Sequence, residues 1–177
     1  MPRKLLNAEL NRLTPHAYAQ APKLPIVLVL DNIRSQHNVG AAFRCADAFC
    51  IEQIFLCGIC AIPPSAEIHK SALGAEETVA WRHFSDTAEA VQGLHQQGYT
   101  VLNIEQVEGA YSLHQFVPQK DTKYALVFGN EVRGVQQEVV DMGDGAIEIP
   151  QFGTKHSLNV SVSIGVVLWD FWAKLCK

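Results

Sequence analysis

Residues 25–49 read PIVLVLDNIRSQHNVGAAFRCADAF, and this stretch decides the class of fold. Its first seven residues, Pro25–Asp31, form a continuous apolar run that ends in an acid, which predicts a buried strand. A polar loop follows, and the small and apolar residues of Asn38–Phe49 are typical of a helix. A buried strand followed directly by a helix is the repeating unit of a parallel α/β sheet.

The same alternation continues along the chain. We therefore predict an open parallel sheet with helices on both faces, in one domain that spans residues 1–177. Residues 3–13 read as a short amphipathic helix within a basic N-terminal extension (1–24). Residues 59–84 contain Pro63-Pro64 and show no clear period, so we expect a long irregular segment there. The other expected strands are 54–58, 100–105, 124–129 and 146–150, and the other expected helices are 85–97, 136–141 and 157–175.

Composition bounds the class of protein. Of the 177 residues 48% are hydrophobic, enough for one substantial core, and only 18% are charged, which argues against disorder. The five cysteines are an odd number without a secretory signal, and the apolar run near the start is too short to span a bilayer. These features predict a protein of the reducing cytoplasm without a membrane partner.

The net charge of −4 is unevenly distributed. Residues 1–44 hold six basic and two acidic residues, a local charge of +4, and the remainder carries −8. Because phosphate contacts act over about a Debye length, roughly 10 Å, a local basic patch is compatible with an RNA partner. A solvated helix face accounts for the same pattern equally well.

Polar junctions follow three of the expected strands. In an open parallel sheet ligands bind at the carboxyl ends of the strands, so these junctions are the candidate site. Taken singly, each has a simpler interpretation. Asn38 is a plausible helix cap with Arg44 on the surface, Gly129–Gly134 a tight turn, and Asn159 a polar residue in a helix whose amide bonds a nearby carbonyl.

Together the junctions carry three motifs in a fixed order. They are Asn-x-Gly-x-x-x-Arg at Asn38–Arg44, Gly-Asn-Glu-x-x-Gly at Gly129–Gly134, and Ile-Pro at 149–150 followed by Ser-Leu-Asn-Val-Ser at Ser157–Ser161. This combination resembles the SpoU/TrmH family of RNA ribose 2′-O-methyltransferases, which belongs to the SPOUT class. The resemblance covers residues 26–172.

The resemblance implies a Rossmann-like SPOUT fold with a deep trefoil knot in residues 124–177, and a homodimer that uses S-adenosylmethionine without a metal. It implies an RNA substrate, for which we favour tRNA. An rRNA substrate and a non-catalytic RNA-binding relative stay open. The implied catalytic residues are Arg44, Asn38, Glu131, Ser157 and Asn159. The implied cofactor-binding residues are Leu102, Asn103, Gly129, Asn130, Gly134, Ile149 and Leu158, and the implied RNA-binding residues are Arg34, Arg44, Lys155 and His156.

The implied roles can be weighed against side-chain chemistry. A guanidinium with a pKa above about 12 hardly deprotonates, so we expect Arg44 to grip an RNA phosphate and to orient the 2′-hydroxyl. A phosphate oxygen or Glu131 would then accept the proton. The resemblance implies that Arg44 faces the methyl donor of the partner subunit. Trp169, Phe171 and Trp172 would supply an apolar interface, or alternatively pack in the core.

Two other chemistries are disfavoured by the sequence. Cys57 and Cys60 have the spacing of a redox dithiol, but Pro63-Pro64 follows where a helix start is needed, and free cysteines are commonly buried small hydrophobes. A nicotinamide dehydrogenase would need Gly-x-Gly-x-x-Gly after the first strand, and residues 31–40 lack it. A non-catalytic relative would be expected to lose Arg44 or Asn159, and both are present.

Overall fold

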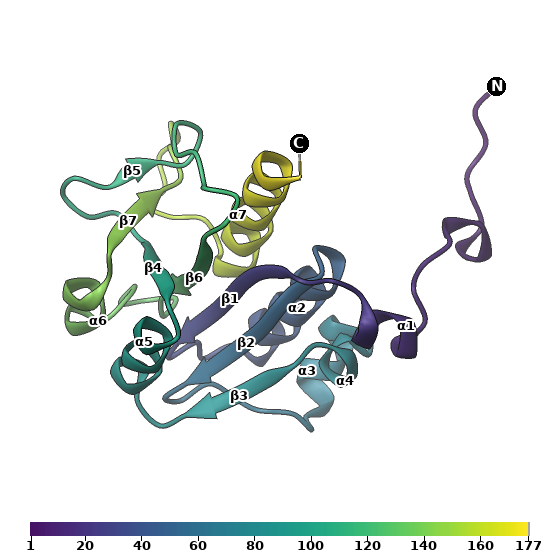
Figure 1. The fold of residues 1–177 in the computed structure, drawn as a ribbon, viewed down its shortest axis with the longest axis horizontal. Coiled ribbons are helices and arrows are strands. Elements are labelled where there is room, and N and C mark those ends of the chain that lie inside the picture. Colours follow the sequence, from purple (N-terminus) through teal and green to yellow (C-terminus); the bar gives the residue numbers. More distant parts are fainter. Residues whose placement is uncertain (177) are drawn as a thin grey trace.

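The computed structural model describes residues 1–176, and a seven-stranded parallel sheet lies at its centre (Figure 1). The order of its strands is β3-β2-β1-β6-β4-β7-β5, and each hydrogen-bonded pair of named strands runs parallel. The prediction of an open parallel α/β sheet is confirmed. The strands are β1 (Leu24–Asp31), β2 (Ile51–Cys57), β3 (Trp81–Phe84), β4 (Tyr99–Ile104), β5 (Tyr111–Ser112), β6 (Lys123–Phe128) and β7 (Gly145–Glu148).

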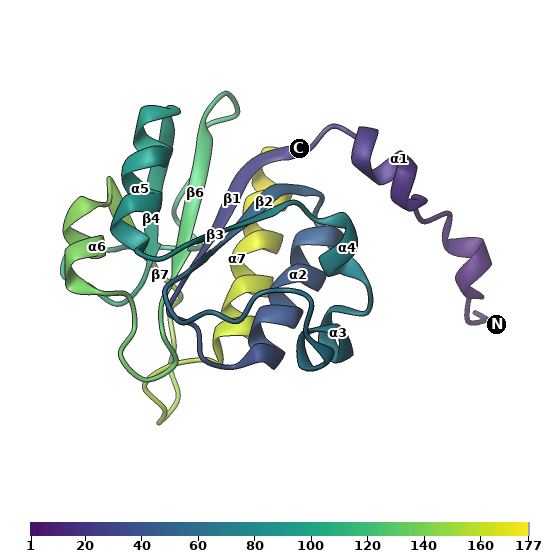
Figure 2. The ribbon, with the colours of Figure 1, turned by 90° about the horizontal axis from the view of Figure 1, so that it is seen from below.

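Helices cover both faces of the sheet, as Figure 2 shows. One face carries α2 (Gln36–Ala48) and α7 (Val160–Leu175), which pack against each other, and the opposite face carries α5 (Thr87–Gln96) and α6 (Gln137–Met142). A hydrophobic core lies on each face of the sheet, and the central strand β1 contributes side chains to both. Ile26, Leu28 and Leu30 join the core under α2 and α7, whereas Val27 and Val29 join the core under α5. This double burial explains why its sequence is apolar without alternation.

A close approach between helices explains one glycine of the first motif. A side chain on Gly40 would clash with the Ser71 hydroxyl and with the carbonyl oxygen of Ile68. Both atoms belong to α3 (Ala66–Ala72), which packs on α2 together with the short α4 (Ala75–Thr78). Gly40 therefore admits a neighbouring helix to the backbone of α2.

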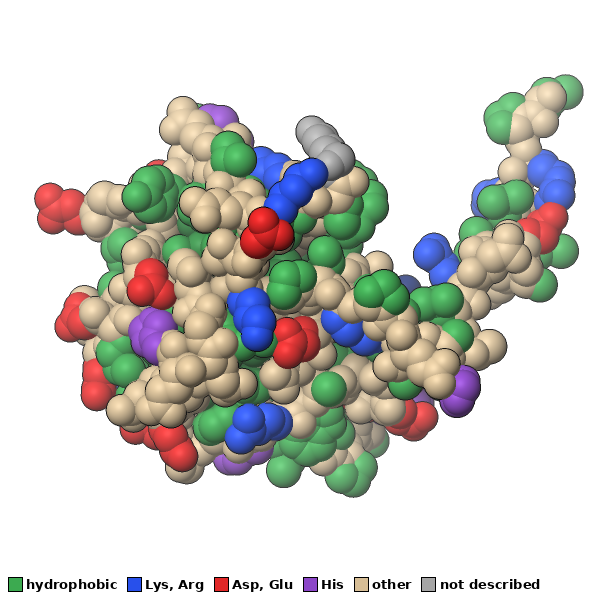
Figure 3. All heavy atoms as spheres, viewed as in Figure 1, with side chains coloured by type: hydrophobic (Ala, Val, Ile, Leu, Met, Phe, Trp, Pro, Cys, Tyr) green, Lys and Arg blue, Asp and Glu red, His purple; other side chains and the backbone are tan. Residues whose placement is uncertain are grey.

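Two sequence predictions are wrong in detail. Residues 59–84 are not irregular, since they form α3, α4 and β3. Residues 3–13 do not form an amphipathic helix. They hold only a 3-10 turn at Asn7–Leu10, and α1 (Pro15–Gln20) follows. This N-terminal arm projects from the body of the protein, with its leucines and basic residues exposed (Figures 1 and 3). It therefore lacks the packing that stabilises a short helix in water.

The last helix begins later than the sequence suggests. It starts at Val160 rather than Ser157, and residues 149–159 form an extended connection from β7 to α7. The three polar junctions consequently meet at the edge where β1, β6 and β7 end. Within residues 1–176 no helix combines the length and the apolar character that a membrane span needs.

Candidate functional site

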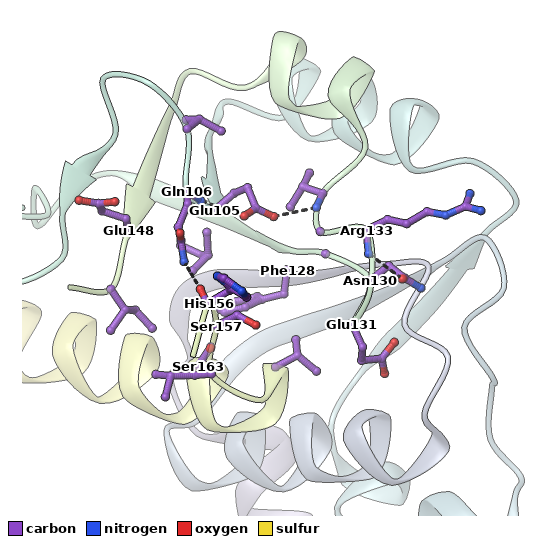
Figure 4. A pocket seen from close by; sticks show the side chains of 18 of the residues that line it. Glu105, Gln106, Phe128, Asn130, Glu131, Arg133, Glu148, His156, Ser157 and Ser163 are labelled. Atoms are coloured by element: carbon purple, nitrogen blue, oxygen red, sulfur yellow. Dashed lines mark hydrogen bonds between the residues drawn. The ribbon is translucent and has the colours of Figure 1, made fainter. Parts of the chain in front are cut away.

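A cavity of about 730 Å³ lies at the carboxyl ends of β4, β6 and β7 (Figure 4). Its size falls within the usual range for small-molecule sites, roughly 300–1,000 Å³. The lining comes from the loops after these three strands and from the start of α7, and it includes residues 104–107, 128–135, 147–149 and 156–160. The second and third motifs thus meet at one cavity, as the sequence predicted for the ends of the strands.

The loop after β6 is folded tightly on itself. The amide of Asn130 donates to the carbonyl of Asn32 at 2.7 Å, and its oxygen accepts from the N–H of Val132 at 2.9 Å. Gly134 has φ of +68°, and a side chain there would clash with the carboxylate of Glu105. That carboxylate also accepts the N–H of Val135 at 2.9 Å. Gly134 is therefore required by both backbone conformation and space.

Glu131 connects the second motif to the first. Its carboxylate accepts hydrogen bonds from the N–H groups of Arg34 and Ser35 and from the side-chain amide of Asn38, each at 3.0 Å. Partial burial acts to raise the pKa of Glu131. The hydrogen bonds from Arg34, Asn38 and Ser35 outweigh this effect and hold the pKa below its usual range.

These contacts revise the role expected of Glu131. A carboxylate with a lowered pKa and three donors is a poor proton acceptor. Asn38 is buried, with 6% of its surface exposed, and its amide is committed to the same carboxylate. We therefore assign Glu131 and Asn38 to positioning of the two loops rather than to proton transfer.

Asp31 is a second connecting carboxylate, and the sequence analysis missed its role. It is fully buried at the end of β1 and accepts from the Thr87 hydroxyl at 2.6 Å. It also accepts from the backbone N–H and the side-chain amide of Gln136 at 2.9 and 2.8 Å. Asp31 thereby ties β1 to the start of α5 and to the loop before α6. An acid that ends a wholly apolar strand was the available signal.

The third motif lies on the other side of the cavity. Ile149, Ser157, Leu158 and Asn159 all line it, as expected. Asn159, however, is an exposed N-cap of α7 rather than a buried polar residue within a helix. Its side-chain oxygen accepts from the N–H and the hydroxyl of Ser161 at 2.9 and 2.6 Å. His156 also lines the cavity, and Gln106 donates to its carbonyl oxygen at 2.8 Å.

Two predicted cofactor-binding residues do not line the cavity. Leu102 and Asn103 lie inside β4, where the side chain of Leu102 packs in the core and that of Asn103 faces the carbonyl of Val140 on α6. Backbone pairing with β6 and β7 further encloses both positions. The prediction placed the contact too early in the chain, because the residues that reach the cavity from this strand are 104–107.

The predicted RNA-binding cations are exposed. Arg34 precedes α2 and Arg44 lies on α2, both outside the cavity, and Lys155 lies on the third loop. Arg44 is thus not brought to the cavity of its own chain. This placement leaves its side chain available to a ligand or to another protein surface.

The cysteine pair has no features of a redox centre. Both thiols are buried, and Cys60 accepts from the N–H of Ile33 at 3.1 Å and donates to the carbonyl of Leu30 at 3.2 Å. Burial raises the pKa of Cys57 and raises that of Cys60 to about 11. Neither thiol is activated, so the interpretation as buried small hydrophobes is favoured.

One group of side chains in residues 1–176 has the composition of a metal site. It comprises His69, Glu76 and Glu77 on α3 and α4. His69 and Glu76 already form an ion pair at 2.5 Å between Nδ1 and Oε1. The group borders a separate hollow and shares no residue with the cavity at the strand ends. The absence of a metal from the reaction stays a prediction.

Comparison with known families assigns the chain to one family. The model of a family described as the SpoU rRNA Methylase family matches residues 25–169. A 23S rRNA (guanosine-2′-O-)-methyltransferase of Neisseria meningitidis is 33% identical over 81% of this chain and 56% of its own length. A tRNA (guanosine(18)-2′-O)-methyltransferase of Thermus thermophilus is 31% identical over 82% of this chain and 73% of its own. The chain thus spans little more than half the length of its rRNA-modifying relative.

Solved structures agree with this assignment. An rRNA methyltransferase of Sinorhizobium meliloti with bound AdoMet superposes with a TM-score of 0.80, at 23% identity, over 89% of this chain and 60% of that one. A structure that concerns the 2-OH methylation of C/U34 on tRNA superposes with a TM-score of 0.75, at 25% identity. That match covers 85% of this chain and 96% of the other. The fold described here is therefore shared with these proteins.

Proposed function

The chain belongs to the SpoU rRNA Methylase family, and from this premise we propose that it methylates the ribose 2′-hydroxyl of RNA, with S-adenosylmethionine as donor and tRNA as substrate. The observation that carries the proposal is the meeting of the second and third motifs at one cavity, with the first motif tied to them through Glu131. Loops distant in sequence converge on one small-molecule site, which is the arrangement that a methyl donor requires.

The residues present fit this donor. The cavity is lined by aliphatic side chains, including Ile104, Ile149 and Leu158, which suit a purine ring. Three acids and one arginine face it, so its charge is negative and favours a ligand that carries a sulfonium and an ammonium group. Gly129 and Gly134, which have no side chains, also line the cavity and leave room for the donor beside the backbone. The Sinorhizobium neighbour, which holds AdoMet, has the same fold.

The chemistry divides between donor and protein. When bound, S-adenosylmethionine supplies a methyl group on a positively charged sulfur, so that a C–O bond to the ribose forms as the S–C bond breaks and a neutral thioether leaves. The protein must align the hydroxyl, exclude water and allow the hydroxyl proton to leave. Glu131 and Asp31 hold the loop after β6 against the β1–α2 region and so keep the site in place for this alignment.

Arg44 is proposed to hold the RNA. An exposed guanidinium grips a phosphate bidentately and fixes the neighbouring ribose. Since Glu131 is engaged by three donors, the hydroxyl proton passes to a phosphate oxygen of the RNA or to water. Ser157, at the rim of the cavity, offers a further hydrogen bond to the substrate.

A homodimer would complete the site. Val162, Val166, Trp169 and Trp172 form an exposed apolar strip along α7, and Phe49 packs against both tryptophans. Phe171 is fully buried, so of the two alternatives left open for it, core packing is the correct one. We propose that α7 and α2 form the interface and that Arg44 serves the cavity of the partner. The cytoplasmic location, the single domain and the knot in residues 124–177 stay predictions.

We propose tRNA as the substrate on the basis of the share of each relative's length that this chain matches. The matched region is 96% of the chain concerned with C/U34 of tRNA and 73% of the Thermus tRNA enzyme. It is only 56% of the Neisseria rRNA enzyme, which has a large unmatched part. A solved neighbour that consists almost wholly of this fold is thus concerned with tRNA methylation. The higher identity of 33% to the rRNA enzyme supports rRNA as a second candidate.

The test is transfer of a labelled methyl group from S-adenosylmethionine into total tRNA and, separately, into rRNA. We expect label in tRNA and a single phosphodiester bond that resists alkali, because a 2′-O-methyl group removes the attacking hydroxyl. Label found only in rRNA would show that the substrate is rRNA rather than tRNA. Absence of donor binding would refute the proposed enzyme activity.

Two substitutions at Arg44 sharpen this test. Arg44→Ala should abolish transfer while leaving donor affinity unchanged, since Arg44 is proposed to hold the RNA rather than the donor. Arg44→Lys keeps the positive charge but cannot bind a phosphate bidentately. Compared with Arg44→Ala, it should therefore recover more of the RNA affinity than of the turnover. Equal loss of donor binding in both variants would contradict the assigned role.

A further inference from the structure

The loop between β7 and α7 presents an aromatic side chain that the proposed reaction leaves unused. Phe152 is 97% exposed, and it belongs to a run of exposed residues from 152 to 159. In Figure 2 this yellow-green loop projects beyond the rest of the protein, at the edge where α2 begins. A fully solvated phenylalanine leaves a large, rigid apolar surface unburied and available to a ligand.

The position of the ring relative to the cavity is defined by its neighbours. Gln151 on one side and His156 to Asn159 on the other line the cavity, whereas Phe152 does not. The ring therefore lies outside the lining, on a loop whose residues on both sides of Phe152 line the cavity. Asn159, the last residue of the loop, is held by the hydroxyls of Ser161 and Ser163. Among described side chains only Gln106 bonds the part from 149 to 158, through the carbonyl of His156, so few contacts oppose its adjustment to a ligand.

The chain segment that carries Phe152 is basic, although three acids line the cavity beside it. From Ile149 to Trp169 the sequence contains no acid, and Lys155 and His156 follow Phe152 within four residues. This local balance contrasts with the net charge of −4 for the whole chain. A phosphate near the loop would meet attraction without a neighbouring carboxylate in the same segment.

We propose that Phe152 is a stacking platform for an unpaired nucleobase of the substrate RNA, beside the nucleotide whose ribose enters the site, with Lys155 on an adjacent phosphate. The inference rests on the proposed function. Proteins read single-stranded RNA by stacking splayed bases on aromatic rings, and stacking accepts any base because every base has a π-face. Phe152 would thus select RNA with an unstacked loop over continuous duplex.

The test compares three substitutions at one position. The probe is a fluorescein-labelled RNA stem-loop, with the matched duplex as a second probe, and anisotropy is measured with S-adenosylhomocysteine saturating. Phe152→Ala should weaken stem-loop binding about 5- to 150-fold, the range that follows from stacking worth roughly 1–3 kcal/mol per base. Phe152→Tyr should bind like wild type, and Phe152→Leu should bind like Phe152→Ala because it keeps apolar surface without a ring.

Two further variants serve as controls. Val117→Ala removes a side chain of similar exposure, 77%, from the loop before β6 at the opposite edge of the sheet, and should leave binding unchanged. Lys155→Ala should reduce the dependence of log Kd on log salt by about one, whereas Phe152→Ala should leave that slope unchanged. Duplex affinity should be the same for wild type and Phe152→Ala.

Other occupants of the Phe152 surface would give different results. A fall in S-adenosylhomocysteine affinity for Phe152→Ala would make the ring a lid on the donor. A shift in sedimentation would make it a contact between subunits. Either result, or unchanged stem-loop affinity, would overturn the inference.

The inference and the proposed function fail separately. If wild type binds the stem-loop through Phe152 but transfers no methyl group to any RNA, the platform stands and the enzyme reading falls. If wild type methylates RNA and Phe152→Ala does so with unchanged affinity, the enzyme reading stands and the platform falls.

Discussion

The loops that enclose the cavity differ sharply in how they are held. The loop after β6, residues 129–136, is fixed by carboxylates and amides on three sides, with Asn130, Glu131 and Gln136 each bonded to the β1–α2 region. The loop after β7, residues 149–159, is exposed over most of its length. Its last residue, Asn159, is bonded to Ser161 and Ser163 of α7, and among described side chains Gln106 alone bonds residues 149–158. One wall of the site is rigid and the other is adjustable.

This difference fits two kinds of ligand. A rigid wall binds a small donor without a further cost in ordering, because the backbone groups are already in place. An adjustable wall accommodates a large polymer whose shape varies. We infer that donor affinity depends mainly on residues 129–136 and RNA affinity mainly on residues 149–159.

Removal of the buried acid should have the largest effect. Asp31→Ala leaves the Thr87 hydroxyl and two donors of Gln136 without their acceptor in a buried site. We expect the free energy of unfolding to fall by about 3 kcal/mol, measured by urea denaturation. Asp121→Ala, at an exposed acid before β6, should change it by less than about 0.5 kcal/mol.

A matched pair of glycines tests the two loops directly. Gly134→Ala places a side chain against Glu105 on a backbone that has positive φ. It should lower the free energy of unfolding by about 2 kcal/mol and weaken donor binding about tenfold. Gly153→Ala meets no atom within 4 Å and should cost less than about 0.5 kcal/mol. Denaturation and donor titration of both variants decide the matter. Equal losses would contradict the contrast between the loops.

Glu131→Gln should destabilise the protein by about 1 kcal/mol at neutral pH, since the amide replaces one of the charged acceptor oxygens. The effect should depend on pH. Because the folded pKa is lowered, the carboxylate stabilises the fold above its unfolded pKa of about 4.5, and this contribution is lost as pH falls through the folded value. The gap between wild type and variant, followed by denaturation from pH 7 to pH 3, should close in acid. A constant gap would contradict the assignment.

The smallest effect is expected at Gln106, whose side chain bonds the carbonyl of His156 in the loop after β7. Gln106→Ala should change the free energy of unfolding by less than about 0.5 kcal/mol. It should nevertheless speed hydrogen exchange and proteolysis within residues 150–158, because these report local opening rather than global unfolding. Protection equal to that of wild type would mean that other contacts hold the loop.

Local sequence signals predicted the main layers of the fold. The apolar runs of β1 and β6 and the small residues of α2 were sufficient, since each element is long and strongly patterned. The segment 59–84 was misread because α3 has only seven residues and β3 four, too few for a periodic signal. Its caps were visible, since Ser65 begins α3 and accepts from the N–H of Ile68.

The candidate site was predicted less evenly. The motif residues at Gly129, Gly134 and Ser157 were found because a known pattern marks them. The role of Asp31 was missed because its partners, Thr87 and Gln136, lie 56 and 105 residues away in sequence. Asn159 was placed inside a helix because the cap position depends on where α7 begins, and helix boundaries are poorly fixed by local pattern.

The apolar strip on α7 also offers a spectroscopic test of the proposed dimer. Of the three tryptophans, Trp169 and Trp172 are 57% and 38% exposed on this strip, and Trp81 is the third. Indole emission shifts to the red when the ring is solvated. Dilution of the unlabelled protein should therefore shift its fluorescence if subunits separate at α7, and the midpoint of that shift would give the dissociation constant of the dimer.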